Sequence, residues 1–416
     1  MARQSFRRAL SFFVLAFGAL QVWPALSVAQ TADANNPQVR EALDLYQSGK
    51  MVEAMPLLED LVARYPADSN LKVRWAYSVA SYAATLTDPE QRKEARLRAR
   101  KIALEAQAAG AQDSILFTIL EWIPEDGSEA AFSPRKEVDA AMKEAEADFV
   151  RGDLDKARDG CLRALLLDPN NYEAALFTGD TYFRQRTLGS AGEWFSRAVQ
   201  IDPNQETAYR YWGDALMLAD KMDEARSKFI QAIIAEPYKR LSWQGVNQWA
   251  QRNHVTLNWV RLQDRSQVSA KDDKHISITI QDTPKDDPNA VAWISYGLGR
   301  AGWHGELFAK EFPNEPKYRR TLKEEAYALG LMVKVLKEQK DFEKISAKLD
   351  PGLLALIKID DAGLLEPFVL LNRADEGIAQ DYIPYRLANR DKLTRYLDEF
   401  VVPKTPAIPE AAPEPR

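Results

Sequence analysis

Small residues recur every 34 positions through the middle of this 416-residue chain. Four such columns stay in register over three successive units: Ala145, Gly179 and Gly213; Ala157, Ala191 and Ala225; Ala164, Ala198 and Ala232; Pro169, Pro203 and Pro237. A fixed period of this length is the signature of a solenoid, in which each supersecondary unit buries its apolar face against its neighbours. The period therefore constrains the fold more than any other feature of the chain.

Each unit carries the pattern of two antiparallel helices that cross closely, because small residues in both helices let the backbones approach. Bulky residues flank the small ones: Phe149, Phe183 and Met217 on the first helix, and Cys161, Phe195 and Phe229 on the second. The proline ends the second helix, since it disfavours helical geometry in the residue before it. The spacing thus predicts helix, turn, helix and stop in each unit of residues 138–239.

These residues resemble the tetratricopeptide repeat family, with the match carried by residues 175–203 and 209–237. Residues 35–68 carry the same internal spacings, on Ala42, Tyr46, Gly49, Ala54 and Pro66. We expect a unit at 69–109 with a lengthened turn near Thr85 to Gln91, a degenerate half-repeat at 110–137, and a further helix at Arg240–Arg252. The resemblance implies a right-handed α-solenoid, assigned to residues 30–252, whose first helices line a concave groove.

From Val255 the hydrophobic period changes to two. Val260 and Leu262 alternate with polar neighbours, as do Ile276, Ile278 and Ile280, which predicts half-buried strands. We expect a β-hairpin at about 257–281, inside a hairpin and linker segment of residues 253–288. Residues 289–402 return to a helical period and predict a helical C-terminal domain. Residues 403–416 contain five prolines and predict a disordered tail. The expected fold class is mainly α.

The first 29 residues have the pattern of a secretory signal peptide. Arg3, Arg7 and Arg8 precede an uncharged apolar stretch, and small residues lead up to a cleavage site after Ala29. The alternative is an uncleaved anchor, since residues 9–29 are barely long enough to span a bilayer. Cleavage leaves a mature chain with 52 basic and 61 acidic residues, a net charge of -9, from the 55 and 61 of the full sequence. We expect a periplasmic or secreted protein with no stable membrane span after cleavage.

Composition and motifs favour binding over catalysis. The full chain has a net charge of -6, whereas a nucleic-acid-binding protein is usually basic. One cysteine and three histidines make a closed Cys/His zinc site implausible. Residues 297–302 match the dinucleotide-binding string, but that string works only between a strand and a helix, and here it lies inside a predicted helix. We therefore expect no enzyme activity, no cofactor and no metal.

The candidate site is the surface of the concave groove. In this family the residue after the small column points into the groove, and here that residue is acidic in each unit: Glu146, Asp180 and Asp214. Other groove candidates lie beside them: Phe183, Arg184, Arg210 and Met217. The stripe predicts a preference for basic and apolar peptide side chains. The alternative is a solvated helix face whose acids pair with neighbouring arginines.

The sequence thus predicts an exported, non-catalytic scaffold or adaptor that binds a protein or peptide. The alternative is an envelope enzyme with its active site between the hairpin and the C-terminal helical block. Five tryptophans are available to line such a cleft: Trp243, Trp249, Trp259, Trp293 and Trp303. The partner's identity and the oligomeric state stay open.

Overall fold

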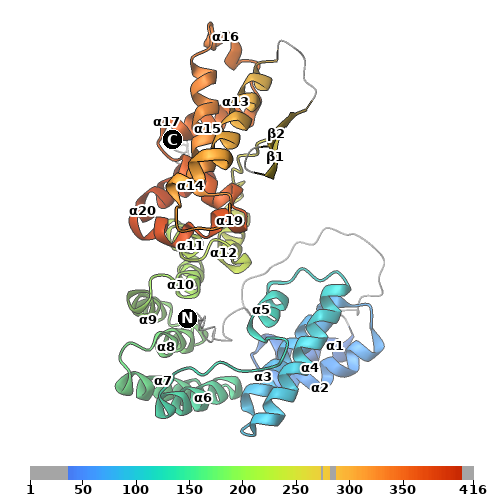
Figure 1. The fold of residues 1–416 in the computed structure, drawn as a ribbon. Helices are drawn as coiled ribbons and strands as arrows, with labels where there is room; N and C mark the ends of the chain where they lie inside the picture. The colour runs from blue at the N-terminus through green and yellow to red at the C-terminus, as the bar shows by residue number, and fades with distance from the viewer. Residues whose placement is uncertain (1–35, 273–274, 282–286, 405–416) are drawn as a thin grey trace, which may run out of the picture. The chain divides into compact units, whose positions relative to one another are not determined.

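The computed structural model describes residues 36–272, 275–281 and 287–404. The chain divides into two compact units, residues 1–249 and residues 250–416. Helices make up most of both units in Figure 1, and one hairpin accompanies them in the second. The predicted signal peptide and residues 405–416 of the predicted tail lie outside the described residues.

The first unit opens with two helix pairs and a short fifth helix: α1 (Pro37–Gln47), α2 (Met51–Arg64), α3 (Ser69–Thr85), α4 (Pro89–Ala108) and α5 (Ser114–Trp122). Aspartates cap α3, α4 and α5, each accepting a hydrogen bond from an amide of the first turn: Asp68, Asp88 and Asp113. The lengthened turn expected near residues 85–91 is wrong. The extra residues lengthen the helices instead, and α4 runs for 20 residues.

The central repeats follow the 34-residue period. They form α6 (Lys136–Arg151), α7 (Leu154–Leu167), α8 (Tyr172–Arg184), α9 (Leu188–Ile201), α10 (Glu206–Leu218), α11 (Met222–Ala235) and α12 (Arg240–Arg252). Each helix pair ends at an Asp-Pro or Glu-Pro step, as predicted from Pro169, Pro203 and Pro237. No strand interrupts residues 138–239. The predicted helical solenoid with a small two-stranded sheet is therefore confirmed.

Aromatic rings from the second helices fill the space that the small residues leave. A Cβ atom added to Gly179 would lie 2.5 Å from Cε1 of Phe195, and one added to Gly213 would overlap the ring of Phe229. In the α6 and α7 pair, a Cβ added to Gly160 would lie 2.9 Å from Cβ of Ala145. The absent side chains thus let the helices approach to ring contact.

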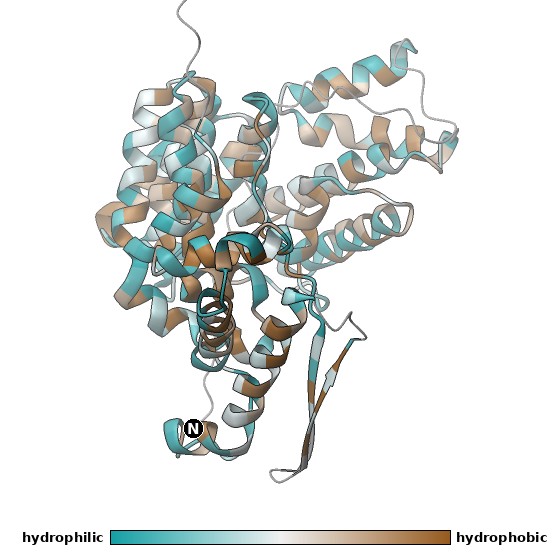
Figure 2. Cartoon of the chain, turned by 90° about the horizontal axis from the view of Figure 1, so that it is seen from above, coloured by the Kyte–Doolittle hydropathy of each residue, from teal (hydrophilic) through white to brown (hydrophobic). Residues whose placement is uncertain are grey.

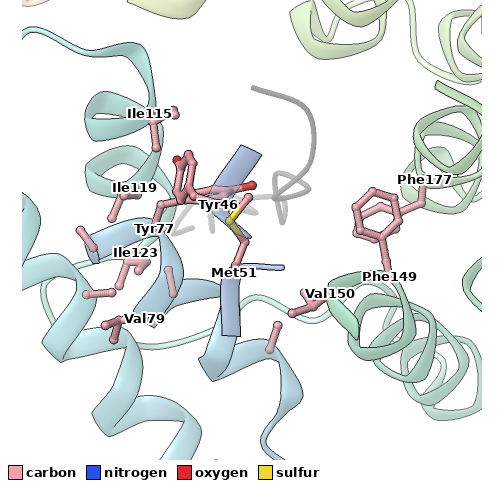
Figure 3. Packing of buried hydrophobic residues seen from close by; sticks show 14 of the residues in the cluster. Tyr46, Met51, Tyr77, Val79, Ile115, Ile119, Ile123, Phe149, Val150 and Phe177 are labelled. Carbon is pink, nitrogen blue, oxygen red and sulfur yellow. The ribbon is translucent and has the colours of Figure 1, made fainter. Parts of the chain in front are cut away.

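One hydrophobic core runs through α1 to α10. Figure 3 shows Tyr46 beside Tyr77 in this core, and Phe149 beside Phe177. The two ring pairs meet edge to face, with centroids 6.0 and 6.1 Å apart, a favourable geometry for aromatic side chains. The N-terminal helix pairs and the central repeats therefore share their core, instead of forming separate domains.

The second unit is a helical block that carries the hairpin. Its helices are α13 (Pro288–Gly302), α14 (Phe308–Glu311), α15 (Leu322–Lys337), α16 (Phe342–Ser346), α17 (Pro351–Asp361), α18 (Leu365–Phe368), α19 (Glu376–Ala379) and α20 (Tyr382–Tyr396), with three π-helical turns, Trp303–Leu307, Val369–Arg373 and Leu397–Val401. The dinucleotide-like string at 297–302 lies within α13. It therefore lacks the strand-to-helix turn that a pyrophosphate site requires.

The hairpin consists of β1 (Ser266–Asp272) and β2 (His275–Ile280), paired antiparallel with Val268 opposite Ile278. It packs on α13, where Gly297 faces Ser266 of β1 and Ile278 of β2. The expectation that the first strand starts near residue 257 is wrong, because Val260 and Leu262 lie in irregular backbone. Two alternating residues were too short a pattern to define a strand.

Apolar and polar residues alternate around the helices, as the mixed brown and teal ribbons of Figure 2 show. This is the pattern of helices that bury one face and expose the other. Among the described residues, no helix combines the length and the apolar character needed to cross a membrane.

Candidate acidic cavity

The first unit contains a cavity of about 1140 Å³. One wall comes from Arg96 and Arg100 of α4, residues 120–122 of α5, the loop that follows α5, and Glu146 of α6. The opposite wall comes from the turns that precede α10 and α12: Asp202, Asn204, Gln205, Glu236 and Lys239. The cavity is large enough for several side chains of a ligand.

The cavity is acidic. Seven of the described residues that line it carry carboxyl groups: Glu121, Glu125, Asp126, Glu129, Glu146, Asp202 and Glu236. Three are cationic: Arg96, Arg100 and Lys239. A hollow lined by one dominant sign of charge concentrates its field on ligands of the opposite sign. The lining therefore favours cationic groups.

Two arginines of α4 hold the first wall in place. Arg96 lies over the ring of Trp122, 4.3 Å from its centroid, and donates to the carbonyl oxygens of Gly127 and Ser128 at 3.0 and 2.9 Å. Arg92 pairs with Glu129, with Nη1 3.2 Å from Oε2. The loop after α5 is thus fixed to α4 by hydrogen bonds from guanidinium groups, which are stronger than those between neutral groups.

Glu146 is the residue of the predicted stripe that reaches this cavity. Its side chain is 1% exposed, and its Oε2 atom accepts no hydrogen bond among the described residues. Nη1 of Arg92 lies 3.8 Å from that atom. Burial, together with the nearby Glu129, raises the pKa of Glu146 to about 8, against the lowering effect of Arg92 and Arg96. At neutral pH Glu146 therefore contributes a mostly protonated carboxyl group to the lining.

A mixed charge cluster joins α5 to the turn that precedes α12. Lys239 lies 2.8 Å from Glu236 and 3.8 Å from Glu121, and Glu236 accepts a hydrogen bond from the amide of Glu206 at 3.1 Å. Burial raises the pKa of Glu121, and Lys239 opposes that shift. Lys239 therefore lies within ion-pair distance of both Glu236 and Glu121.

The predicted stripe is not the exposed row of carboxylates that the sequence suggested. Asp180 is fully buried and neither of its carboxylate oxygens accepts a hydrogen bond among the described residues. Burial raises its pKa well above the usual value, although Arg210 lies near. Asp214 is half-buried, and burial raises its pKa to about 7. The expectation that Asp180 is exposed was wrong, because α8 is buried without interruption from Tyr172 to Thr181.

The other predicted groove residues lie outside the cavity lining. Arg210 is 4% exposed and pairs with Glu206, with Nε 2.9 Å from Oε2. Arg184 donates to the carbonyl oxygen of Phe149 at 3.3 Å and lies over that ring. Phe183 is buried, and Met217 is half-buried. The acid that pairs with Arg210 is thus Glu206, which is buried and does not belong to the predicted stripe.

Sequence reasoning missed most of the cavity residues. Asp202 and Glu236 immediately precede the repeat prolines, and were interpreted only as the ends of helices. Glu121, Glu125 and Glu129 lie in the half-repeat and its loop, where the period is lost. An acidic residue recurring before each proline was the available signal.

Neither a metal centre nor a reactive thiol emerges from the described part of the chain. No group of three or more His, Cys, Asp or Glu side chains there is arranged to hold a metal ion. Cys161 is buried, and burial raises the pKa of its thiol far above the usual value. The thiolate needed for nucleophilic chemistry is therefore disfavoured.

Residues 136–206 match the family model of the tetratricopeptide repeat. The match covers the first two of the three units in which the 34-residue columns are unbroken. A comparison with curated proteins gives no match.

Solved structures of repeat proteins resemble parts of the chain weakly. The first tetratricopeptide domain of Spaghetti (RPAP3), bound to an HSP90 peptide, is 20% identical, with a TM-score of 0.27 over 28% of this chain and 93% of that one. PilF of Pseudomonas aeruginosa is 13% identical, with a TM-score of 0.26 over 53% and 85% of the two chains. YrrB, a repeat protein with an unusual peptide-binding site, is 16% identical, with a TM-score of 0.24 over 52% and 92%. At these scores the likeness carries no inference about ligands.

Proposed function

We propose that this protein is an exported, non-catalytic scaffold that binds a basic, partly apolar segment of a protein partner in the acidic cavity of its repeats. The observation that carries the proposal is the lining of the cavity, in which carboxyl groups outnumber cations seven to three. Stacked repeats provide a large, rigid concave surface, which suits binding more than turnover.

The form of the cavity supports a peptide as ligand. Leu120, Trp122 and Phe132 contribute apolar surface among the acids. A segment with lysine or arginine side chains next to aliphatic ones matches both parts of this lining. Binding by such a cavity depends on electrostatic attraction, so we expect it to weaken as salt rises.

The test uses fluorescein-labelled ten-residue peptides of equal apolar content with net charges of about +4, 0 and −4, titrated with the full chain by fluorescence anisotropy. The cavity variant is Glu121→Gln with Glu125→Gln. The matched control is Glu59→Gln with Glu144→Gln, which removes two exposed carboxylates that lie outside the lining.

We expect the basic peptide to bind most tightly, with an affinity reduced roughly tenfold in the cavity variant and nearly unchanged in the control. Equal binding of all three peptides would contradict the proposal. So would equal losses in the cavity variant and the control, because the lining would then have no special role.

The alternative function, an envelope enzyme, receives less support. It needs tryptophan rings that line a cleft with converging acids, but Trp249, Trp293 and Trp303 are buried. Trp259 is 42% exposed, and none of the five tryptophans lines the acidic cavity.

Export is proposed from the sequence of residues 1–29, which lie outside the described residues. Mass spectrometry of the protein recovered from cells separates the two forms. A mature N-terminus at Gln30 supports cleavage and a periplasmic or secreted protein. Retention of residues 1–29 in a membrane fraction supports the anchor, and an intact chain in the cytoplasm contradicts both.

A further inference from the structure

The hairpin of the second unit has an open edge. In the described part of the chain the sheet has two strands, β1 and β2, and the amide of Gln281 donates to the carbonyl oxygen of Arg265 at 2.9 Å. In an antiparallel pair, residues alternate between facing the partner strand and facing away. The backbone groups of Ile276, Ile278 and Ile280 therefore point away from β1, along the outer edge of β2.

This edge lacks the charged residues and prolines that usually protect exposed strands, and the register shift of the described pair lies between Ala270 and Asp272 of β1. Lysine, inward-pointing charges, proline and bulges prevent unwanted pairing in many proteins. Residues 275–281, His-Ile-Ser-Ile-Thr-Ile-Gln, contain no proline and no lysine, arginine, aspartate or glutamate. An edge without these residues favours a partner strand on β2.

The two faces of β2 differ. Ile276, Ile278 and Ile280 are half-buried on the face toward α13, whereas Ser277 and Thr279 are exposed on the other face. Exposed apolar side chains remain on α13 itself: Val291, Ile294 and Leu298, at 42%, 45% and 57% exposure. A wider sheet thus has apolar surface beside it to cover.

We propose that the partner strand is β2 of a second copy of this chain, paired antiparallel about Ile278. This register sets Ile278 opposite its own copy and Ile276 opposite Ile280. All three isoleucines whose backbone groups point to the outer edge of β2 are then paired. It also sets Ser277 opposite Thr279 on the exposed face. Sliding the register by two residues leaves one of the outward-facing isoleucines without an isoleucine opposite it, which makes this register the best matched.

The lack of charge on β2 supports pairing with a second copy. Residues 275–281 carry no lysine, arginine, aspartate or glutamate. Two copies paired in this register therefore place no like charges opposite each other, and like charges there would be destabilising.

The first test compares two variants of the exposed face by sedimentation velocity on the full chain between about 1 and 100 μM. Ser277→Lys with Thr279→Lys sets lysines opposite each other across the dimer. Ser277→Lys with Thr279→Glu sets opposite charges there at the same two positions. These side chains face away from α13, so we expect both variants to fold, which circular dichroism checks.

We expect the wild type and the Lys/Glu variant to dimerise, and the Lys/Lys variant to dimerise roughly tenfold more weakly. A wild type that stays monomeric at about 100 μM overturns the proposal, and leaves the edge for a different partner strand. Equal dimerisation of the two variants overturns it as well, because the dimer would then lie elsewhere.

The second test fixes the register with single cysteines. Chains carrying Ser277→Cys and chains carrying Thr279→Cys are oxidised separately and as a mixture. Opposed residues can form a disulfide, whereas residues more than about 7 Å apart at Cα cannot. Cys161 is buried and should not compete. We expect cross-linked dimers mainly in the mixture, and equal yields in all three samples would overturn the register.

Discussion

Two fully buried acids, one in each unit, differ in the partners that surround them. In the second unit Glu325 is fully buried and accepts hydrogen bonds from Tyr296, Arg320 and Arg373, at 2.9, 3.0 and 2.6 Å. In the repeats Asp180 is equally buried, yet neither of its oxygens accepts a hydrogen bond among the described residues. Burial alone raises the pKa of both acids. The arginines reverse the shift for Glu325, whose pKa is lowered, whereas that of Asp180 stays raised.

This contrast separates acids that hold a structure together from acids that lack their counter-charge. A buried carboxylate with two arginines stabilises the fold and has little capacity left for a ligand. A buried carboxylic acid without a hydrogen-bond partner is kept neutral by its raised pKa and weakens the fold. The repeats also contain one acid of the first kind, Glu206, whose pKa Arg210 lowers against the effect of burial, and their helices pack through rings that lie against small residues.

The largest expected effect is in the second unit. Glu325→Ala leaves the guanidinium groups of Arg320 and Arg373 without their buried partner. Breaking a buried pair in this way typically costs about 3–5 kcal/mol, which urea unfolding at pH 7 measures. Glu338→Ala removes an exposed glutamate at the end of the same helix and is the control. A cost for Glu325→Ala below that of the control would show that the network does not stabilise the block.

The stability of the repeats should depend on how closely their helices pack. Gly179→Leu forces a side chain into the ring of Phe195, and overpacking typically costs about 1–3 kcal/mol. Gly189→Leu on the neighbouring helix is matched, since a Cβ there meets nothing within 4 Å. We expect the melting temperature to fall markedly for Gly179→Leu, and to stay the same or rise for Gly189→Leu. Equal melting temperatures would place the close helix crossing elsewhere.

The burial of Glu146 in the cavity should make the free energy of unfolding depend on pH. Since the pKa of Glu146 is raised to about 8 from 4.5, the folded chain keeps its proton while the unfolded chain loses it. The wild type therefore loses stability as pH rises from about 4.5 to 8, and Glu146→Gln does not. We expect the variant to gain roughly 3 kcal/mol relative to wild type between pH 5 and pH 8, because about 1.4 kcal/mol per pH unit applies over most of that interval.

The free energy of unfolding at each pH, from urea titrations, measures this gain. Glu144→Gln, an exposed position on the same helix, controls for the loss of a carboxylate. If the two variants follow the same curve from pH 5 to pH 8, the raised pKa of Glu146 is contradicted.

The smallest expected loss of stability is for Asp264→Asn in the second unit, which compares an exposed ion pair with the buried one of Glu325. Asp264 pairs with Arg373 at 2.9 Å but is 49% exposed. An exposed pair contributes about 0–1 kcal/mol, so Asp264→Asn should cost far less than Glu325→Ala, although both acids contact the same arginine. Urea unfolding compares them directly. Similar losses would mean that burial does not set the strength of these pairs.

The repeat helices could be predicted because their period is local and repeated. Proline steps and small residues at a fixed spacing determine where each helix ends and which face it buries. The exposure of Glu146 and Asp180 could not be predicted this way, because helix pattern says which face a residue occupies but not what else lies against that face. The resemblance supplied a groove, whereas the structure buries these two side chains.

The cavity and the network of the second unit depend on long-range contacts. Glu325 meets Tyr296, Arg320 and Arg373 from segments separated by up to 48 residues, and no local period connects them. The hairpin could be predicted in part from the sequence. Alternation predicted the strand at Ile276 to Ile280, but a shorter alternation at Val260 and Leu262 predicted a strand that does not form.

The ring of Phe229 has a consequence for how this sequence can change. It lies against Gly213 of α10 and also against Gly245 of α12, where an added Cβ would overlap it. The three positions are therefore coupled, and a methyl group at either glycine becomes tolerable only when the ring is replaced by a smaller side chain. Substitutions here should be harmful singly and compatible in combination. Sequence change at this point of the repeats is thus constrained to coordinated steps, because the ring of Phe229 couples Gly213 of α10 to Gly245 of α12.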